Sequence, residues 1–189
     1  SVYTPAMQSQ SQQAMTHWIG TLASGGIIRS AHEEAGLTVA IFVVGEDRLS
    51  ELREWMVAQS RETIAREQRA AIEICIWMAN ADRQLDPEEA HLLKQLIGKS
   101  GLDEDTQDLL VAEVHDPPSL AGVEDRLTHP VLRELLLALS WELAMSDGSI
   151  DASEENFATG LAVRLGVDEA RAAEIKDAVV ARVSVPPAP

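Results

Sequence analysis

The chain has 189 residues, a formal net charge of −16 and only 4% aromatic residues. A surface this acidic repels phosphate backbones, so the charge disfavours nucleic-acid binding and favours cations or basic protein surfaces as ligands. The single cysteine, Cys75, excludes an internal disulfide and a thiolate-rich metal cluster, and its apolar neighbours predict a core position.

The N-terminal region divides into two predicted parts. Residues 1–16 are rich in Gln and Ser and lack an apolar period, which predicts a flexible arm. Residues 17–60 carry many apolar side chains and predict helices that extend the main domain and dock it to a partner, although a strand at 37–44 stays open. That run is too short to span a bilayer, which needs roughly 20 apolar residues. We expect a cytoplasmic protein, either free or attached to the periphery of a membrane.

The rest of the chain predicts an all-α helical bundle. Apolar residues from Asp47 to Asn80 recur at steps of three and four, which predicts one long helix or two. We expect one helical domain over residues 61–183, followed by a proline-rich tail at 184–189. Further helices are predicted at 87–98, 104–114, 120–127, 130–146, 152–164 and 168–182, with Pro117, Pro118 and Pro130 as breakers.

An internal duplication lies within the predicted domain. The segment from Asp82 aligns without a gap on the segment from Asp147, at an offset of 147 − 82 = 65 residues. The two copies span about residues 65–114 and 130–182, so the bundle is predicted to have a pseudo-twofold repeat. From Asp82 to Glu104 the identical pairs are Asp82/Asp147, Asp86/Asp151, Glu89/Glu154, Leu96/Leu161, Gly101/Gly166, Asp103/Asp168 and Glu104/Glu169.

Both copies contain the pattern Asp-x-x-apolar-Asp-x-x-Glu after an apolar helix. The stretches from Ala79 to Glu89 and from Ala144 to Glu154 resemble the paired signatures of TerB-like domains. These domains are named for a tellurite-resistance protein and also occur at the N-terminus of a membrane-anchored DnaJ-type co-chaperone. The resemblance covers about residues 65–182. It implies an all-α fold, an acidic cation-binding site near the repeat junction, and a role as a stress-related adaptor or assembly module.

The spacing of the acids also has a direct chemical interpretation. It gathers three carboxylates around one turn, and oxygen ligands of this kind suit a hard cation such as Ca²⁺ or Mg²⁺. Leu85 and Ile150, between the aspartates, are expected to pin each turn to the core. The first half of a calcium-binding EF-hand loop is missing, which predicts weak affinity. The candidate metal ligands are Asp82, Asp86 and Glu89 in the first turn and Asp147, Asp151 and Glu154 in the second.

Helix capping is the competing interpretation of the same acids. An aspartate at the N-cap with a glutamate three residues later starts a helix without any ligand, and each cap contributes about 1 kcal/mol. Capping leaves Asp82 and Asp147 unexplained, because a carboxylate at a helix C-terminus opposes the helix dipole. Both interpretations stay open. Of the two turns, the second is expected to bind a cation better, since Gly148 follows Asp147 where the first copy has Arg83, and Glu155 adds an acid.

The search for catalytic motifs points away from an enzyme. Glu88 and His91 have the spacing of a di-iron helix, but that site needs the motif twice, so His91 is expected on the surface. No nucleophile elbow, phosphate-binding loop or dinucleotide fingerprint is present. We therefore expect a non-catalytic acidic adaptor for a protein partner with a basic surface. The alternative is a structural subunit of a larger, membrane-associated complex, in which the acidic turns are only helix caps.

Overall fold

A computed structural model describes residues 43–81, 85, 87–144 and 150–183 of the chain. Within these residues the chain forms α-helices and no strand, which confirms the all-α fold class. Residues 1–42 and 184–189 lie outside the described part of the chain. The predicted arm at 1–16, the first part of the predicted extension at 17–60 and the proline-rich tail at 184–189 all fall there. The helices are α3 (Glu46–Ala58), α4 (Arg61–Ala79), α5 (Pro87–Gly98), α6 (Glu104–Glu113), α7 (Val123–Arg126), α8 (Pro130–Ala144), α9 (Ala152–Arg164) and α10 (Glu169–Val183).

Local chemistry decides between one helix and two after Asp47, and it shortens the helix predicted at 120–127. The stretch from Asp47 to Asn80 is two helices, because Gln59 is extended and the Ser60 side chain accepts a hydrogen bond of 3.2 Å from the Thr63 amide. That N-cap begins α4. The helix predicted at 120–127 is wrong in its length, since Gly122 adopts a left-handed φ of 79° and α7 begins only after it.

The helix ends follow the 65-residue offset of the duplication. Helix α4 ends at residue 79 and α8 at 144, α5 begins at 87 and α9 at 152, and α6 begins at 104 and α10 at 169. Gly101 and Gly166, which the offset also pairs, both have positive φ, at 76° and 66°. Only glycine adopts this region without strain, so the turn between the second and third helix of each copy depends on it. The duplication in sequence is thus a duplication of helix order.

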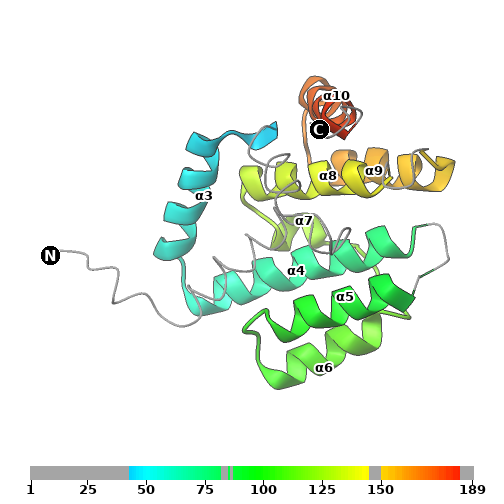
Figure 1. Ribbon diagram of the computed structural model, residues 1–189. Coiled ribbons are helices and arrows are strands. Elements are labelled where there is room, and N and C mark those ends of the chain that lie inside the picture. Colours follow the sequence, from blue (N-terminus) through cyan, green and yellow to red (C-terminus); the bar gives the residue numbers. More distant parts are fainter. Residues whose placement is uncertain (1–42, 82–84, 86, 145–149, 184–189) are drawn as a thin grey trace, which may run out of the picture.

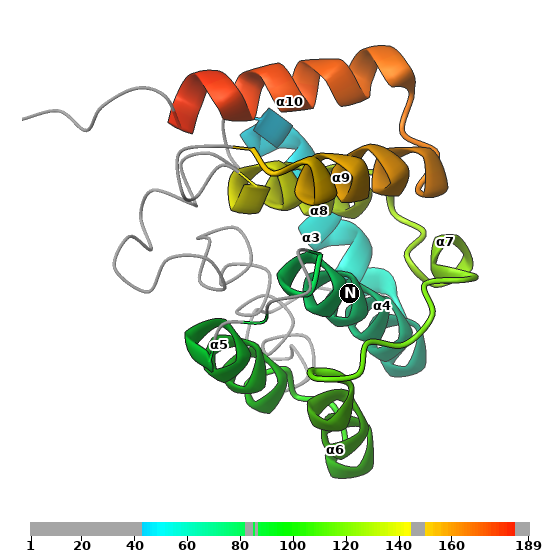
Figure 2. The ribbon, with the colours of Figure 1, turned by 90° about the vertical axis from the view of Figure 1, so that its right-hand side faces the viewer.

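The two copies pack against each other through their first helices, α4 and α8. Helix α4 contacts α5, α6 and α7, whereas α8 contacts α3, α9 and α10 as well as α4. Figures 1 and 2 both show α10 beyond α8 and α9, with α5 and α6 on the far side of α4. Cys75 of α4 is buried, as predicted, and burial raises the pKa of its thiol to about 12. Leu85 and Ile150 are partly buried and pack against the core, as the sequence predicted for these two side chains.

Glu134 of α8 joins three helices through one buried carboxylate. Its Oε2 pairs with Arg48 of α3 and its Oε1 accepts a hydrogen bond from Arg171 of α10. Arg171 also donates a hydrogen bond of 3.0 Å to the Val43 carbonyl. The Glu134 side chain is only 7% exposed. This carboxylate therefore holds α3, the described end of the N-terminal extension, against the second copy.

The two guanidinium groups determine how Glu134 titrates. Burial by itself would raise its pKa, but the hydrogen bonds and charges of Arg48 and Arg171 outweigh burial and hold the pKa below the ordinary value. A carboxylate whose pKa is lower in the folded state stabilises the fold above its unfolded pKa, near 4.5, and that contribution is lost as the pH falls through the folded value.

We predict that Glu134→Gln lowers the free energy of unfolding by about 2 kcal/mol at neutral pH, less than a fully buried pair would lose because both arginines are partly exposed. The difference from wild type should shrink below about pH 4.5, where the wild-type carboxylate also becomes protonated. Urea unfolding across this pH range measures it. Glu174→Gln, which removes the exposed partner of Arg171, is the control and should change stability little. A loss that is independent of pH would contradict the account.

Candidate functional site

The acids of the two predicted turns are only partly within the described residues. Asp82, Asp86 and Asp147 lie outside them, and for Glu89 only the helical backbone is described. Asp151 is exposed and caps α9, because its Oδ1 accepts a hydrogen bond of 2.6 Å from the Ser153 amide. Capping thus accounts for one oxygen of Asp151.

Glu154 is the second described acid of the later turn. It lies half-buried in the first turn of α9, three residues after Asp151. Of the six candidate metal ligands, the structure thus places two, Asp151 and Glu154, at the start of one helix. Among the residues with described positions, no group of three or more His, Cys, Asp or Glu side chains could hold a metal ion.

The acid next to this turn has a partner from within the chain. Glu155 Oε1 lies 3.3 Å from Lys176 Nζ of α10, and the same ammonium lies 4.7 Å from the centroid of the Trp141 ring. The indole face favours a cation at that position. Lys176 therefore supplies the second turn with a positive charge that the sequence alignment did not show, and Glu155 is less available to an added cation.

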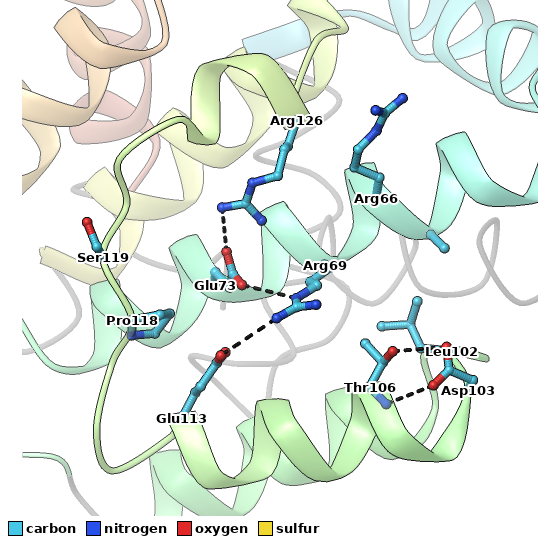
Figure 3. A pocket seen from close by; sticks show the side chains of 11 residues that line it. Arg66, Arg69, Glu73, Leu102, Asp103, Thr106, Glu113, Pro118, Ser119 and Arg126 are labelled. Atoms are coloured by element: carbon cyan, nitrogen blue, oxygen red, sulfur yellow. Dashed lines mark hydrogen bonds and ion pairs between the residues drawn. The ribbon is translucent and has the colours of Figure 1, made fainter.

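A pocket that was not predicted from the sequence lies between α4, α6 and α7. Its volume is about 500 Å³, and Figure 3 shows charged side chains around it from α4, α7 and the ends of α6, with Pro118 and Ser119 from the segment between α6 and α7. Three arginines and three acids line it, alongside small and apolar residues. The charged lining residues are Arg66, Arg69 and Glu73 of α4, Asp103 and Glu113 at the ends of α6, and Arg126 of α7.

Glu73 organises the inner wall of this pocket. Its side chain is 4% exposed, its Oε1 accepts a hydrogen bond of 3.2 Å from Arg69 Nε, and its Oε2 lies 2.7 Å from Arg126 Nη2. Arg69 also reaches Glu113, whose Oε1 lies 3.9 Å from Arg69 Nη2. Arg66 is exposed at the rim and forms no ion pair with another described residue. The pocket therefore has a fixed inner pair of guanidinium groups and a freer one outside.

The pKa values of two acids in the pocket are shifted in opposite directions. Asp103 caps α6, and the hydrogen bonds from the Thr106 amide and hydroxyl, at 2.8 and 2.9 Å, lower its pKa. Burial and then the neighbouring charge of Glu73 raise the pKa of Glu113. The Asp103 carboxylate is thus engaged with its own helix, whereas Glu113 is a carboxylate held only loosely.

Sequence reasoning had one usable signal for this pocket. Arg69 and Glu73 have the i, i+4 spacing of a helical ion pair. Nothing local indicates that Arg126, on a short helix 53 positions further along (126 − 73), would reach the same carboxylate. His91 is exposed as predicted and contacts Gln95 on its own helix. The pocket offers guanidinium donors and carboxylate acceptors, which is the chemistry of binding charged groups.

The fold and the site define an all-α protein with a duplicated three-helix unit and a polar pocket beside its first copy. Residues 68–177 match the family described as tellurite resistance protein TerB. The match covers more than half of the chain, and the chain belongs to the TerB family. No curated protein and no solved structure matches the chain. No helix in the described part of the chain has the length and apolar character to cross a membrane.

Proposed function

We propose that this protein is a non-catalytic cytoplasmic adaptor of the TerB family that binds a partner with a basic and partly apolar surface. The observation that carries the proposal is the outer face of α6. The ten residues of this helix include no basic side chain. Leu109 on the same helix is 54% exposed, so this face combines acidic side chains with a large apolar one.

The exposed residues of α6 form one continuous face. Asp105, Asp108, Leu109 and Ala112 are all exposed, and their spacing of three, four and seven residues places them on the same side of the helix. The buried side is marked by Leu110, which is fully buried. A partner with basic groups around an apolar contact complements this face, since charge steers association and apolar burial holds the complex.

A structural subunit of a larger, membrane-associated complex is the second candidate function. The observation that favours it is the fixed position of α3, the described end of the N-terminal extension, through Arg48 and Glu134. Residues before α3 would then carry the docking contacts, and the α6 face would serve only to keep the surface hydrated. The two candidates differ in which part of the chain a partner needs.

We predict that the variant Asp105→Asn/Asp108→Asn/Leu109→Ala weakens binding to a purified partner, first captured by affinity purification, by tenfold or more. One buried apolar contact and two steering charges together justify about that loss. The measurement is isothermal titration at two salt concentrations, since the variant should also show a shallower salt dependence.

The matched control removes one exposed apolar side chain and two acidic charges from other helices. Val163 is 78% exposed on α9, and Glu169 and Asp177 are exposed acids on α10. The variant Val163→Ala/Glu169→Gln/Asp177→Asn should bind like wild type. Equal loss in both variants would mean that only overall charge matters. Loss on deleting residues 1–45, with both variants unaffected, would replace the adaptor with the structural subunit.

We further propose that the adaptor binds Ca²⁺ or Mg²⁺ weakly at its acidic turns, with Asp147, Asp151 and Glu154 as the better site and Asp82, Asp86 and Glu89 as the other. What supports this is the start of α9, where capping engages Oδ1 of Asp151 with Ser153 and Glu154 lies half-buried one turn away. An exposed aspartate has a second oxygen to offer a hard cation. Lys176, paired with Glu155, limits the affinity.

We predict that divalent ions raise the thermal unfolding midpoint of the wild type by mass action, with about 2.7 kcal/mol gained at a hundred times the dissociation constant. Asp147→Asn should abolish most of the shift and Asp82→Asn less of it. Asp108→Asn, an exposed acid of α6 outside both turns, is the charge-matched control and should keep the full shift. If matched monovalent ionic strength raises the wild-type midpoint equally, the turns are caps alone.

A further inference from the structure

The pocket between α4, α6 and α7 brings three arginines together beside three acids, in a chain that has few basic residues. Three of the chain's 15 basic residues, Arg66, Arg69 and Arg126, line this one pocket. Each guanidinium has five N–H donors in a planar fork, a geometry that matches the oxygens of carboxylate and phosphate groups. Their convergence is a feature of the fold, because Arg126 comes from α7 and the other two from α4.

The inner two arginines are held in place with donors to spare. Nε of Arg69 pairs with the Glu73 carboxylate, and Nη2 of Arg69 pairs with Glu113. Glu73 also pairs with Nη2 of Arg126. The remaining N–H groups of Arg126 have no hydrogen-bond partner among the described residues. Because buried Glu73 fixes both side chains, a ligand would lose little of its binding energy to ordering them.

The three acids of the pocket differ in how strongly they offset the positive charge of its arginines. Glu73 is shared between two arginines, and Asp103 accepts both hydrogen bonds of Thr106. Glu113 is the acid that competes for Arg69, at the longer distance of 3.9 Å. Arg66 at the rim has no carboxylate partner in the described part of the chain. Among the described residues, the Arg66 guanidinium thus forms no ion pair, and the Glu113 carboxylate forms only a long one.

We propose that this pocket binds the oxyanion group of a small ligand, a carboxylate or a phosphate, between Arg126, Arg69 and Arg66. The volume of about 500 Å³ lies in the range of small-molecule sites. The net charge of −16 repels large polyanions at a distance, so the ligand is a small one that reaches the guanidinium groups directly. The inference is independent of the α6 face and of the acidic turns, and it adds a ligand site to the proposed adaptor.

The test is a titration of the full chain with two probes, sodium pyrophosphate and sodium citrate, at constant ionic strength. Nuclear magnetic resonance shifts of the backbone amides report both the affinity and the location of each probe. Saturable shifts should centre on α4, α6 and α7. Tighter binding of pyrophosphate would identify a phosphate ligand, and tighter binding of citrate would identify a carboxylate ligand.

Three variants make the test specific. Arg66→Ala removes the arginine that supports no other described ion pair, so the fold should survive and affinity should fall about tenfold. Arg61→Ala is the control, since Arg61 is an exposed arginine on the same helix that does not line this pocket, and its affinity should be unchanged. Glu113→Gln removes the competing negative charge at nearly constant shape, so affinity should rise severalfold.

The gain in Glu113→Gln is the outcome that a damaged fold cannot produce. The proposal is overturned if neither probe gives saturable shifts at millimolar concentration. It is also overturned if Arg61→Ala and Arg66→Ala lose affinity equally, or if Glu113→Gln fails to bind more tightly. A localised site with the three expected changes would establish it, whatever the outcome for the α6 partner.

Discussion

Burial of carboxylates on the two central helices is the constraint on which the arrangement of this protein depends. Glu67 and Glu73 of α4 and Glu134 of α8 are all buried. An ionised carboxylate away from water needs charged or hydrogen-bonding partners, and breaking such a pair costs several kcal/mol. Glu134 fixes α3 and α10 through Arg48 and Arg171, Glu73 fixes α7 through Arg126, and Glu67 accepts hydrogen bonds from the Thr128 amide and hydroxyl before α8.

This arrangement divides the acids of the described residues into buried, paired groups and exposed ones. The buried acids form ion pairs with arginines, including Arg69, Arg126 and Arg171. Few basic side chains therefore remain to neutralise the exposed acids. Helix α6 shows the result, with acids, an exposed Leu109 and no base along its length. The pocket lies between α4, α6 and α7, and the side chains of Arg69 and Arg126, which pair with Glu73 there, stay partly exposed. The same pairing that stabilises the fold thus leaves an acidic face on α6 and a pocket lined by three arginines and three acids beside α4.

The sequence predicted the helices well and the polar interior poorly, for a physical reason. Helix ends depend on neighbouring residues, such as Asp103 and Asp151 at N-caps and Gly166 at a left-handed turn, and these signals repeat at the 65-residue offset. A buried acid depends on partners that lie far along the chain, as Thr128 does from Glu67. The duplication gives no help here, because the offset pairs Arg69 with Glu134 (69 + 65), which are residues of opposite charge. The candidate metal ligands stay a prediction, since Asp82, Asp86 and Asp147 lie outside the described residues and only the backbone of Glu89 is described.

The most direct test of this account is a carbon-13 nuclear magnetic resonance titration of the glutamate carboxyl groups in the folded protein. The arginines around Glu134 hold its pKa below the ordinary value of 4.5, whereas burial raises the pKa of Glu67 despite its hydrogen bonds from Thr128. The account predicts that Glu134 titrates below the ordinary value of 4.5 and Glu67 above it. If Glu134 and Glu67 both titrate at the ordinary value, these carboxylates are not the buried, partnered groups that hold the helices in place.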